Sequence, residues 1–438
     1  MTPGGGSAVS RGGLLAVAMG LIVLASCSGS SSNNNSTPVN PSTANTAPVT
    51  VGFGALGPSG GYVNGIWTSV TICAPGSTNN CQTIPNVLVD TGSVGLRVLS
   101  SALTVSLPSV DDSSGNVLQE CIQFADFSYV WGPVAFAGLE FPDTGETALQ
   151  VPGQTANSGV PIQIIAASPS SAVPSGCLAS PLSSGSEIDR NTLENLGGNG
   201  ILGIGNFPQD CGGSCATASV SQYFVCPSGA CAVSRVPLQH QLWNPVSAFS
   251  SSDTNGVLLI LPSVPAGGAA SVTGSLIFGI GTQSDNSIGA APVYEIDDYG
   301  DFPQVIYNGL AYTSPNNGSF IDSGSDAIYF SDAGSLASTG IVECRDGFAG
   351  YYCPGSTIPF TVTVYGANGV QGAVQFSIAN AINLFSTNFA AFSDLAGDSG
   401  SGRSTDYVDL GLPFFLGRSV FVGIAGANNT YPNGFWAF

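Results

Sequence analysis

Two short segments, one in each half of the chain, place an aspartate directly after an apolar run and before a hydroxyl residue and a glycine. They are Asp90-Thr91-Gly92-Ser93 and Asp322-Ser323-Gly324-Ser325. Two carboxyl groups held close together cannot both ionise, so they share one proton and titrate as a unit. One carboxylate can then take a proton from a bound water while the other carboxyl donates a proton to a carbonyl group. The repeat therefore indicates general acid–base hydrolysis without a covalent intermediate.

The residues around each aspartate are of the types that such a pair needs. Gly92 and Gly324 allow backbone N–H groups to approach the carboxylates. If the two segments face each other across a pseudo-two-fold axis, the hydroxyls on the residues after the aspartates can hydrogen-bond across it. These are the hydroxyls of Thr91 and Ser323. The other two hydroxyls are expected to bond the outer carboxylate oxygens, and they belong to Ser93 and Ser325.

Each aspartate must be positioned by a strand that ends in a turn. Apolar residues precede both aspartates, and more follow, at Val94, Leu96 and Val98 in the first half and at Ile328 and Phe330 in the second. The chain has 438 residues, of which 59 are glycine, 43% are hydrophobic and 8% are charged. This composition favours a large core built from short strands and turns rather than long helices. We therefore expect an all-β fold in two halves, with few short helices.

Three further segments accompany the aspartates: Gly200-Ile201-Leu202-Gly203, Gly274-Ser275-Leu276-Ile277-Phe278-Gly279, and Leu410-Gly411 with the apolar run after it. In this order, from about residue 50 to 438, the set resembles the pepsin-like aspartic proteases. The resemblance implies a bilobal double barrel with pseudo-two-fold symmetry, its N-terminal lobe over 49–236 and its C-terminal lobe over 237–438. It also implies Asp90 and Asp322 as the catalytic pair, a peptide or protein substrate, and no cofactor or metal.

The sequence departs from the family pattern at three places. The family carries a tyrosine on a hairpin, the flap, over the cleft. Alternation either side of Trp131-Gly132-Pro133 predicts this hairpin, with Tyr129, Trp131 and Gly132 as flap candidates and ordinary cross-strand packing as the alternative. The family's tryptophan that braces the flap tyrosine is replaced by Arg97, which is either a salt-bridged brace or a substrate contact. Asp409 stands where an apolar residue normally precedes Leu-Gly.

The N-terminus has the pattern of a targeting segment. The apolar run from Leu14 to Ala25 is too short to span a bilayer. It ends in Leu24-Ala25-Ser26-Cys27, which resembles the lipobox of bacterial lipoproteins, and a non-lipidated secretory signal is the alternative. We expect a signal peptide over 1–27 with a lipidated Cys27, and a disordered Ser/Asn/Thr/Pro tether over 28–48. The combination with the two aspartates also resembles an uncharacterised family of bacterial lipoproteins, so we expect the cell envelope as location, at the outer membrane, cell surface or periplasm.

Ten cysteines follow Cys27, and an even number in an exported protein predicts disulfides. The ten are Cys73, Cys81, Cys121, Cys177, Cys211, Cys215, Cys226, Cys231, Cys344 and Cys353. Short loops favour pairing Cys73 with Cys81 and Cys344 with Cys353, and a Cys121–Cys177 pair is a further candidate. The four cysteines between 211 and 231 cannot be paired from spacing, and zinc is the alternative for them.

The charge balance limits the partners. The net charge is −20, and the seven basic residues are all arginine. Nucleic acids and anionic membrane surfaces both need basic patches, so neither is expected as a partner, and membrane contact should be through the lipid alone. A protein with so few bases suits an acidic medium, and solubility through acidic charge is the alternative explanation of this composition. His240 has no nucleophile motif beside it and is expected to be structural.

Together these features predict a monomeric, lipid-anchored aspartic endopeptidase that works at acid pH. One alternative is a non-catalytic lipoprotein of the same fold that binds a peptide or glycan. A weaker alternative is a surface adhesion module that uses its Ser/Thr-rich strands.

Overall fold

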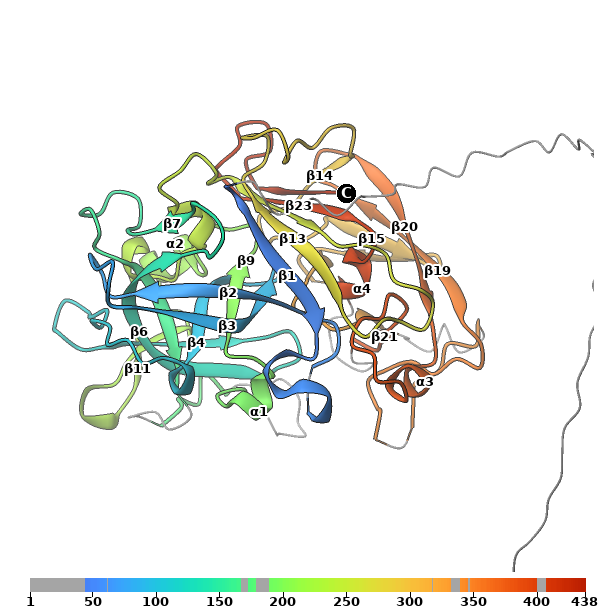
Figure 1. The fold of residues 1–438 in the computed structure, drawn as a ribbon, viewed down its shortest axis with the longest axis horizontal. Coiled ribbons are helices and arrows are strands. Elements are labelled where there is room, and N and C mark those ends of the chain that lie inside the picture. The colour runs from blue at the N-terminus through green and yellow to red at the C-terminus, as the bar shows by residue number, and fades with distance from the viewer. Residues whose placement is uncertain are drawn as a thin grey trace, which may run out of the picture. The chain divides into compact units, whose positions relative to one another are not determined.

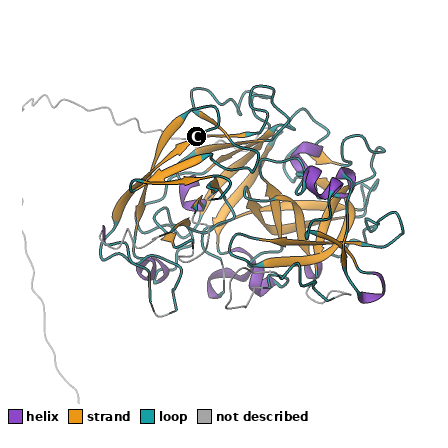
Figure 2. Ribbon diagram, turned by 180° about the vertical axis from the view of Figure 1, so that it is seen from behind, coloured by secondary structure: helices purple, strands orange, loops and turns teal. Residues whose placement is uncertain are grey.

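The computed structural model describes residues 44–60, 62–166, 172–178, 189–316, 318–331, 339–345, 347–399 and 407–438. These described residues belong to one compact unit. The predicted signal peptide, the lipidation site Cys27 and the tether up to residue 43 lie outside the described residues. The described part consists mainly of strands joined by loops, with short helical turns between them (Figure 2).

Six strands of the first half close into a barrel, because β6 pairs at one edge with β8 and again with β2. The order around the barrel is β6-β8-β4-β9-β3-β2. The bounds are β2 (Gly65–Cys73), β3 (Cys81–Asp90), β4 (Val94–Leu99), β6 (Tyr129–Glu140), β8 (Val160–Ile165) and β9 (Gly200–Ile204). Their inward-facing aliphatic side chains, such as Val70, Val89 and Leu96, are fully buried, so burial of apolar surface stabilises the barrel.

The sheet of this barrel continues into the second half through β1, which lies between β2 and β13 (Figure 1). The strands of the continuation are β1 (Thr46–Gly52), β13 (Val272–Phe278), β12 (Gly256–Ile260), β23 (Ser419–Gly423), β24 (Phe435–Ala437) and β14 (Val293–Glu295). The strands that complete it on the first-half side are β5 (Leu118–Gln123), β7 (Thr147–Ala148), β10 (Tyr223–Val225) and β11 (Ala232–Val233).

Two four-stranded sheets complete the second half. The first consists of β16 (Leu310–Thr313), β15 (Gln304–Tyr307), β19 (Ile358–Tyr365) and β20 (Gln371–Ile378). The second consists of β17 (Phe320–Ile321), β22 (Val408–Leu410), β18 (Ile328–Phe330) and β21 (Ala396–Gly397). The helices of the described residues are all short: α1 (Leu193–Leu196), α2 (Gly212–Thr217), α3 (Ala381–Phe385) and α4 (Leu412–Phe415), with 3₁₀ turns η1 (Gly54–Ser59), η2 (Ser100–Ala102), η3 (Pro227–Gly229), η4 (Leu238–His240) and η5 (Pro245–Ala248).

The second of these sheets repeats the strand pairing around β3. In the first half β3 pairs parallel with β9, β9 antiparallel with β4, and β4 parallel with β8. In the second half β17 pairs parallel with β22, β22 antiparallel with β18, and β18 parallel with β21. The two aspartate segments therefore occupy equivalent places in two copies of one motif, and the predicted all-β fold with internal pseudo-symmetry is confirmed.

The predicted hairpin turn at Trp131-Gly132-Pro133 is wrong. β6 runs without interruption from Tyr129 to Glu140 and changes partners along its length, pairing with β5, β8 and β2. The hairpin does exist, but its turn lies between β5 and β6, where the N–H of Phe124 bonds the carbonyl of Ser128. Pro133 pairs opposite Gln119 next to the change of partner from β5 to β8, where a missing N–H costs little.

All ten predicted cysteines form disulfides. The expected pairs Cys73–Cys81, Cys121–Cys177 and Cys344–Cys353 are confirmed. The four that spacing left open pair as Cys211–Cys215 and Cys226–Cys231, which leaves none of these four thiols for the zinc alternative. Five disulfides indicate that the folded part matures in an oxidising compartment. Among the described residues, no helix has both the length and the apolar character needed to cross a membrane.

Candidate functional site

The two aspartates lie where short parallel strand pairs end. Asp90 is the last residue of β3 and stands opposite Gly203 of β9. Asp322 directly follows β17, and its N–H donates to the carbonyl of Leu410 at 3.2 Å. In both copies the chain then turns sharply and returns as β4 or β18, so the turn after each aspartate is fixed on both sides by strands.

The turns are joined by a reciprocal set of hydrogen bonds. The Oγ1 of Thr91 accepts from the N–H of Ser323 at 2.9 Å and donates to the carbonyl of Ile321 at 3.3 Å. The Oγ of Ser323 accepts from the N–H of Thr91 at 3.1 Å and donates to the carbonyl of Val89 at 2.7 Å. Thr91 and Ser323 are 3% and 0% exposed, so water cannot replace these bonds. The predicted contact across the axis is therefore present, and it locks the two halves together at the aspartates.

Each carboxylate receives donors from its own turn. The N–H of Gly324 donates to Asp322 Oδ1 at 2.7 Å, and the N–H of Gly92 donates to Asp90 Oδ1 at 2.9 Å and to Asp322 Oδ1 at 3.2 Å. A single N–H thus reaches the inner oxygen of both aspartates. The outer oxygens accept from the serines, Asp90 Oδ2 from Ser93 Oγ and Asp322 Oδ2 from Ser325 Oγ at 2.9 Å.

The glycines of the two turns are required by space. A Cβ on Gly92 would lie 2.6 Å from Cγ of Asp322, and a Cβ on Gly324 would lie 2.7 Å from Oδ1 of Asp90. Both distances are far below van der Waals contact, so any side chain would push the opposite carboxylate away. Each glycine therefore allows the aspartate of the other half to approach, and the crossed pattern shows how close the two carboxyl groups are.

Burial raises the pKa of Asp322 well above its usual range, and the nearby charges of Asp90 and then Asp409 raise it further. The donor Gly324 N–H opposes this shift. The pair of Asp90 and Asp322, called the aspartate pair below, accordingly keeps one proton over a wider pH range than two separate carboxylates would.

Tyr62 and Asp326 also lie at this site, and the sequence did not indicate them. The hydroxyl of Tyr62 donates to the carbonyl of Gly324 at 2.5 Å, and its ring meets Trp67 edge-on with centroids 6.0 Å apart. The carboxylate of Asp326 accepts from Tyr329 at 2.5 Å and from Tyr351 at 2.6 Å. Asp326 directly follows the second aspartate motif, but its partner Tyr351 is 25 positions away, and Tyr62 precedes Gly324 by 262 positions, so these contacts could not be predicted from local sequence.

The flap candidates Tyr129, Trp131 and Gly132 lie within β6 rather than at a hairpin turn. Tyr129 and Trp131 are buried in a cluster with the Cys121–Cys177 disulfide and Phe224. A Cβ on Gly132 would lie 1.9 Å from the carbonyl oxygen of Ile164 in β8, so this glycine lets two strands approach. Their role as a flap stays a prediction.

Arg97 is a brace. Its guanidinium is fully buried, lies 2.7 Å from Oε1 of Glu120 and 3.6 Å from Oδ2 of Asp210, and donates to the carbonyl of Val94 at 2.7 Å. Burial and the neighbouring Glu120 raise the pKa of Asp210 well above its usual range, which favours its neutral form, so one arginine faces two buried carboxyl groups. His240 lies in η4, with its ring edge-on to Phe136 at 5.9 Å.

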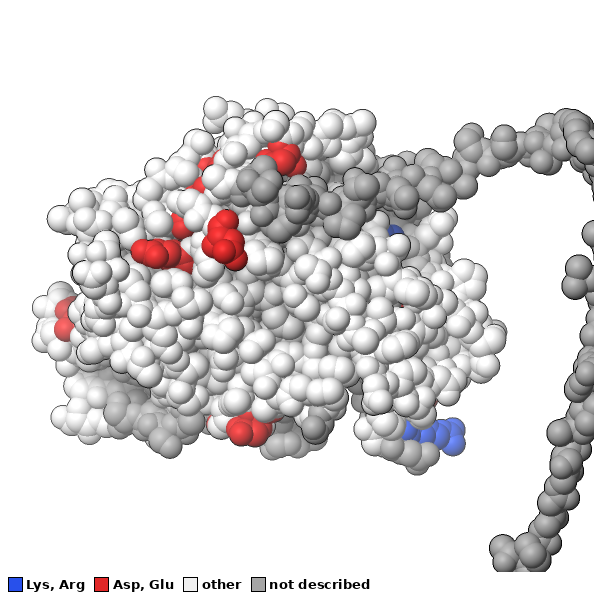
Figure 3. Space-filling model, in the orientation of Figure 1, with Lys and Arg blue, Asp and Glu red and all other residues white. Residues whose placement is uncertain are grey.

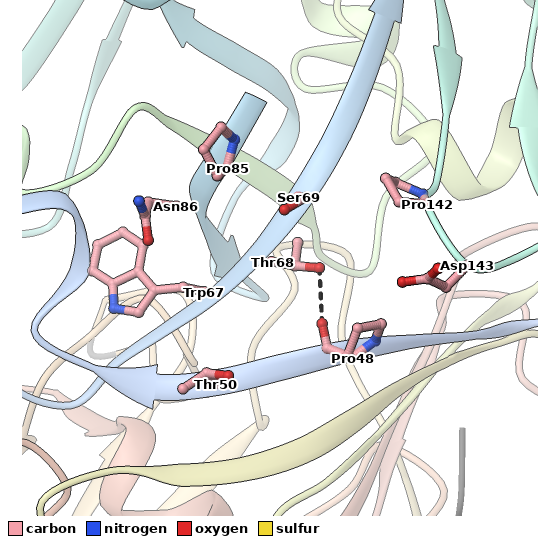
Figure 4. A pocket seen from close by; sticks show the side chains of 9 residues that line it. All are labelled: Pro48, Thr50, Trp67, Thr68, Ser69, Pro85, Asn86, Pro142 and Asp143. Atoms are coloured by element: carbon pink, nitrogen blue, oxygen red, sulfur yellow. Dashed lines mark hydrogen bonds between the residues drawn. The ribbon is translucent and has the colours of Figure 1, made fainter. Parts of the chain in front are cut away.

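One pocket lies away from the aspartates. It has a volume of about 250 Å³ and is formed by β1, β2, β3 and the loop after β6 (Figure 4). Trp67, Pro85 and Pro142 form its apolar walls, and Thr68 Oγ1 donates to the carbonyl of Pro48 at 3.1 Å within it. Neither Asp90 nor Asp322 lines it. On the face shown in Figure 3, the described residues carry scattered acidic groups and no cluster of basic ones.

The fold of this chain is similar to that of a solved structure. Among solved structures, the aspartic proteinase from Irpex lacteus matches with a TM-score of 0.50 over 90% of this chain and 96% of that one, at 15% sequence identity. At this identity the match shows the fold alone, which is the pepsin-like fold predicted above. The family model of a protein of unknown function (DUF3443) matches residues 41–438, and the chain belongs to that family. A sequence search of the curated proteins gave no match.

Proposed function

We propose that this protein is an aspartic-type endopeptidase, in which Asp90 and Asp322 activate a water molecule to hydrolyse a peptide bond. The observation that carries the proposal is the position of Gly92, whose single N–H reaches Oδ1 of both carboxyl groups at 2.9 and 3.2 Å. Carboxyl groups this close hold one proton between them, which supplies a general base and a general acid at the same place.

The reaction follows from that single proton. The ionised member of the pair takes a proton from the water, whose oxygen forms a bond to the carbonyl carbon of the peptide. The protonated member gives its proton to the carbonyl oxygen, so the pair still holds one proton after this step. The member that now holds the proton gives it to the amide nitrogen, while the other member takes a proton from a hydroxyl of the tetrahedral intermediate. The C–N bond then breaks, a carboxylic acid and an amine leave, and the pair again holds one proton. Thr91, Gly92, Ser93, Ser323, Gly324 and Ser325 keep the two carboxyl groups in place.

The test is hydrolysis of denatured protein by the purified chain at pH of about 3 to 6, where such pairs hold their shared proton. Asp90→Asn and Asp322→Asn should each lower the rate of hydrolysis by about 10²–10⁴-fold, which is the contribution expected of a general acid or base. A statine-type inhibitor should block the wild type. Asp112→Asn is the matched control, because Asp112 lies on an exposed turn and bonds only its own loop. A wild-type protein that cleaves no member of a broad peptide library at any pH would exclude the proposal.

The same variants distinguish the proposed endopeptidase from a non-catalytic protein of the same fold. A pepsin-fold protein that only binds a peptide or glycan would retain its ligand without cleaving it, and an adhesion module would still bind whole cells when both aspartates are replaced. We propose a peptide or protein substrate, a monomeric state and the two lobes 49–236 and 237–438, with size-exclusion chromatography as the check on the oligomeric state.

We further propose that the chain is anchored to a bacterial cell envelope by a lipid on Cys27 after removal of the signal peptide. The Leu24-Ala25-Ser26-Cys27 sequence supports the anchor, and the five disulfides support export to an oxidising compartment. Cys27→Ala should convert a membrane-bound protein into a soluble one. Persistent sedimentation of that variant with membranes would contradict the anchor.

A further inference from the structure

A third carboxyl group, that of Asp409, lies beside the aspartate pair. Asp409 is 2% exposed and stands in β22 opposite Phe320 of β17 and Tyr329 of β18. The equivalent residue of the first half is Ile201, because Ile201 stands opposite Leu88 two residues before Asp90 and opposite Arg97 seven residues after it. The second half therefore has an acid where the first half has a buried apolar side chain.

Asp409 is connected to the pair by one hydroxyl. The Oγ of Ser325 lies 2.9 Å from Oδ2 of Asp322 and 2.6 Å from Oδ2 of Asp409. A serine hydroxyl has a single proton and can donate to only one of these oxygens. The other carboxyl group must then carry its own proton and donate it to Ser325 Oγ. This three-membered chain, Asp409–Ser325–Asp322, therefore contains a carboxyl proton in addition to the serine proton.

The surroundings of Asp409 favour its neutral form. Its Oδ1 is buried and has no hydrogen-bond partner among the described residues. The titratable groups that face it from the neighbouring elements are Asp322 after β17, Asp326 before β18, Tyr329 on β18 and Asp90 across the pair. None of these described groups is a cation. An ionised Asp409 would leave a buried anionic oxygen unpaired, whereas a neutral one leaves only a carbonyl oxygen unpaired.

We propose that Asp409 is a positioning residue of the site, which in its protonated form donates to Ser325 Oγ and so directs the serine proton onto Oδ2 of Asp322. In this state the ionised form of Asp322 keeps a donor on its outer oxygen. When Asp409 loses its proton, the direction of these hydrogen bonds reverses. The Ser325 hydroxyl then donates to the ionised Asp409 instead of Asp322, and a negative charge is added beside Asp322. The proton affinity of Asp322 is thereby tied to the protonation of Asp409.

The electrostatics agree with this geometry. Burial raises the pKa of Asp409 well above its usual range, and the charges of Asp90 and Asp326 add to the shift while the bond from Ser325 opposes it. This raised pKa favours the neutral form of Asp409 up to a higher pH than for an ordinary aspartate. The proposal that Asp322 is part of a catalytic pair is needed for an effect on cleavage, but the hydroxyl chain itself can be tested without any activity.

The decisive variant is Asp409→Asn, which keeps the shape and can still donate to Ser325 but never ionises. NMR of the full chain, with aspartate labelled at the carboxyl carbon, follows each carboxyl group through pH 3 to 9. In the wild type, Asp409 should titrate well above the ordinary aspartate value of about 3.9. In the wild type the ionisations of Asp409 and Asp322 are coupled through Ser325, so a negative charge on Asp409 opposes the ionisation of Asp322. In Asp409→Asn this charge can never form, and the midpoint of Asp322 should fall by about one pH unit.

Two further variants make the test specific. In a Ser325→Ala background the effect of Asp409→Asn on Asp322 should shrink, since the connecting hydroxyl is gone. Asp394→Asn is the matched control, because Asp394 is also a buried carboxyl of the second half but bonds the N–H of Gly267. If cleavage is observed, the alkaline limb of its pH profile should move by the same amount in Asp409→Asn. An ordinary midpoint for Asp409, an unchanged midpoint for Asp322, or an effect of equal size without Ser325 would each overturn the proposal, whether or not the protein cleaves peptides.

Discussion

At the scale of single residues, the aspartate pair depends on two glycines, whose lack of a side chain lets the two carboxyl groups approach each other. Gly92 faces Asp322 and Gly324 faces Asp90, each at a distance that leaves no room for a side chain. The acid–base groups could be predicted from two short motifs because both motifs are local in sequence. Asp409 could be recognised as unusual, but its contact with Ser325 could not be predicted, since the two are 84 positions apart.

Gly92→Ala should separate the two carboxyl groups. The added Cβ would lie 2.6 Å from Cγ of Asp322, and overpacking of this kind typically lowers the free energy of unfolding by about 1–3 kcal/mol. We expect a lower melting temperature in calorimetry and, on the proposed function, loss of cleavage. Gly213→Ala is the matched control, because a Cβ on Gly213 in α2 meets nothing within 4 Å. Equal melting temperatures for the two variants would show that the turn has more room than the distances indicate.

At the scale of elements, the hairpin of β5 and β6 is tied to β4 by a buried ion pair. Arg97 on β4 is bound to Glu120 on β5 and lies near Asp210 in the loop after β9. The alternation of apolar residues predicted the hairpin, but the prediction of Trp131-Gly132-Pro133 as its turn is wrong. Gly and Pro usually mark turns, yet here Gly132 admits a close neighbouring carbonyl and Pro133 lies next to a change of partner strand. Such tertiary reasons for Gly and Pro cannot be read from one segment.

Arg97→Met should therefore destabilise the first half strongly. It removes the only cation that faces the buried carboxyl groups of Glu120 and Asp210 among the described residues, and breaking a buried ion pair from one side costs about 3–5 kcal/mol. Urea unfolding measures this loss. The exposed Arg235 provides the control, since Arg235→Met should change the free energy of unfolding by at most about 0.5 kcal/mol. If Glu120→Gln in the Arg97→Met background restores no stability, the unpaired charge is not the cause of the loss.

At the scale of the whole molecule, the acidic composition acquires a specific consequence. Burial raises the pKa of carboxyl groups at several places in the described part, and for Asp301 it raises the pKa to about 7. The other groups with a raised pKa, each with burial as the main cause, are Glu146, Asp210, Asp322, Asp326, Asp394 and Asp409. The pKa is lowered at Asp112 and Asp126. Composition predicted compatibility with acid, but which carboxyl groups are buried follows only from the fold.

The folded protein should be most stable at mildly acid pH. A carboxyl group whose pKa is higher in the folded state binds more protons there than in the unfolded state, so stability falls as pH rises from the unfolded value, about 4, through the folded value. The melting temperature should thus decrease between pH of about 5 and 8. Asp301→Asn should make the decrease of the melting temperature with pH smaller up to pH of about 7, because this carboxyl group with a raised pKa is then missing. A melting temperature that rises over the same range would show that the lowered pKa values dominate.

The pairing of β1 with β13 also determines the order in which the chain can acquire its structure. Asn45, at the start of the described part, donates to the carbonyl of Phe278 across 233 positions of sequence. During synthesis and export the N-terminal strand emerges first, yet its partner strand emerges only after more than half of the chain has followed. Pairings of such long range raise the contact order and slow folding, because loop closure must precede the contacts that reward it. One edge of β1 can pair early with β2, which follows it directly, but the edge that pairs with β13 stays without its partner strand until late in synthesis.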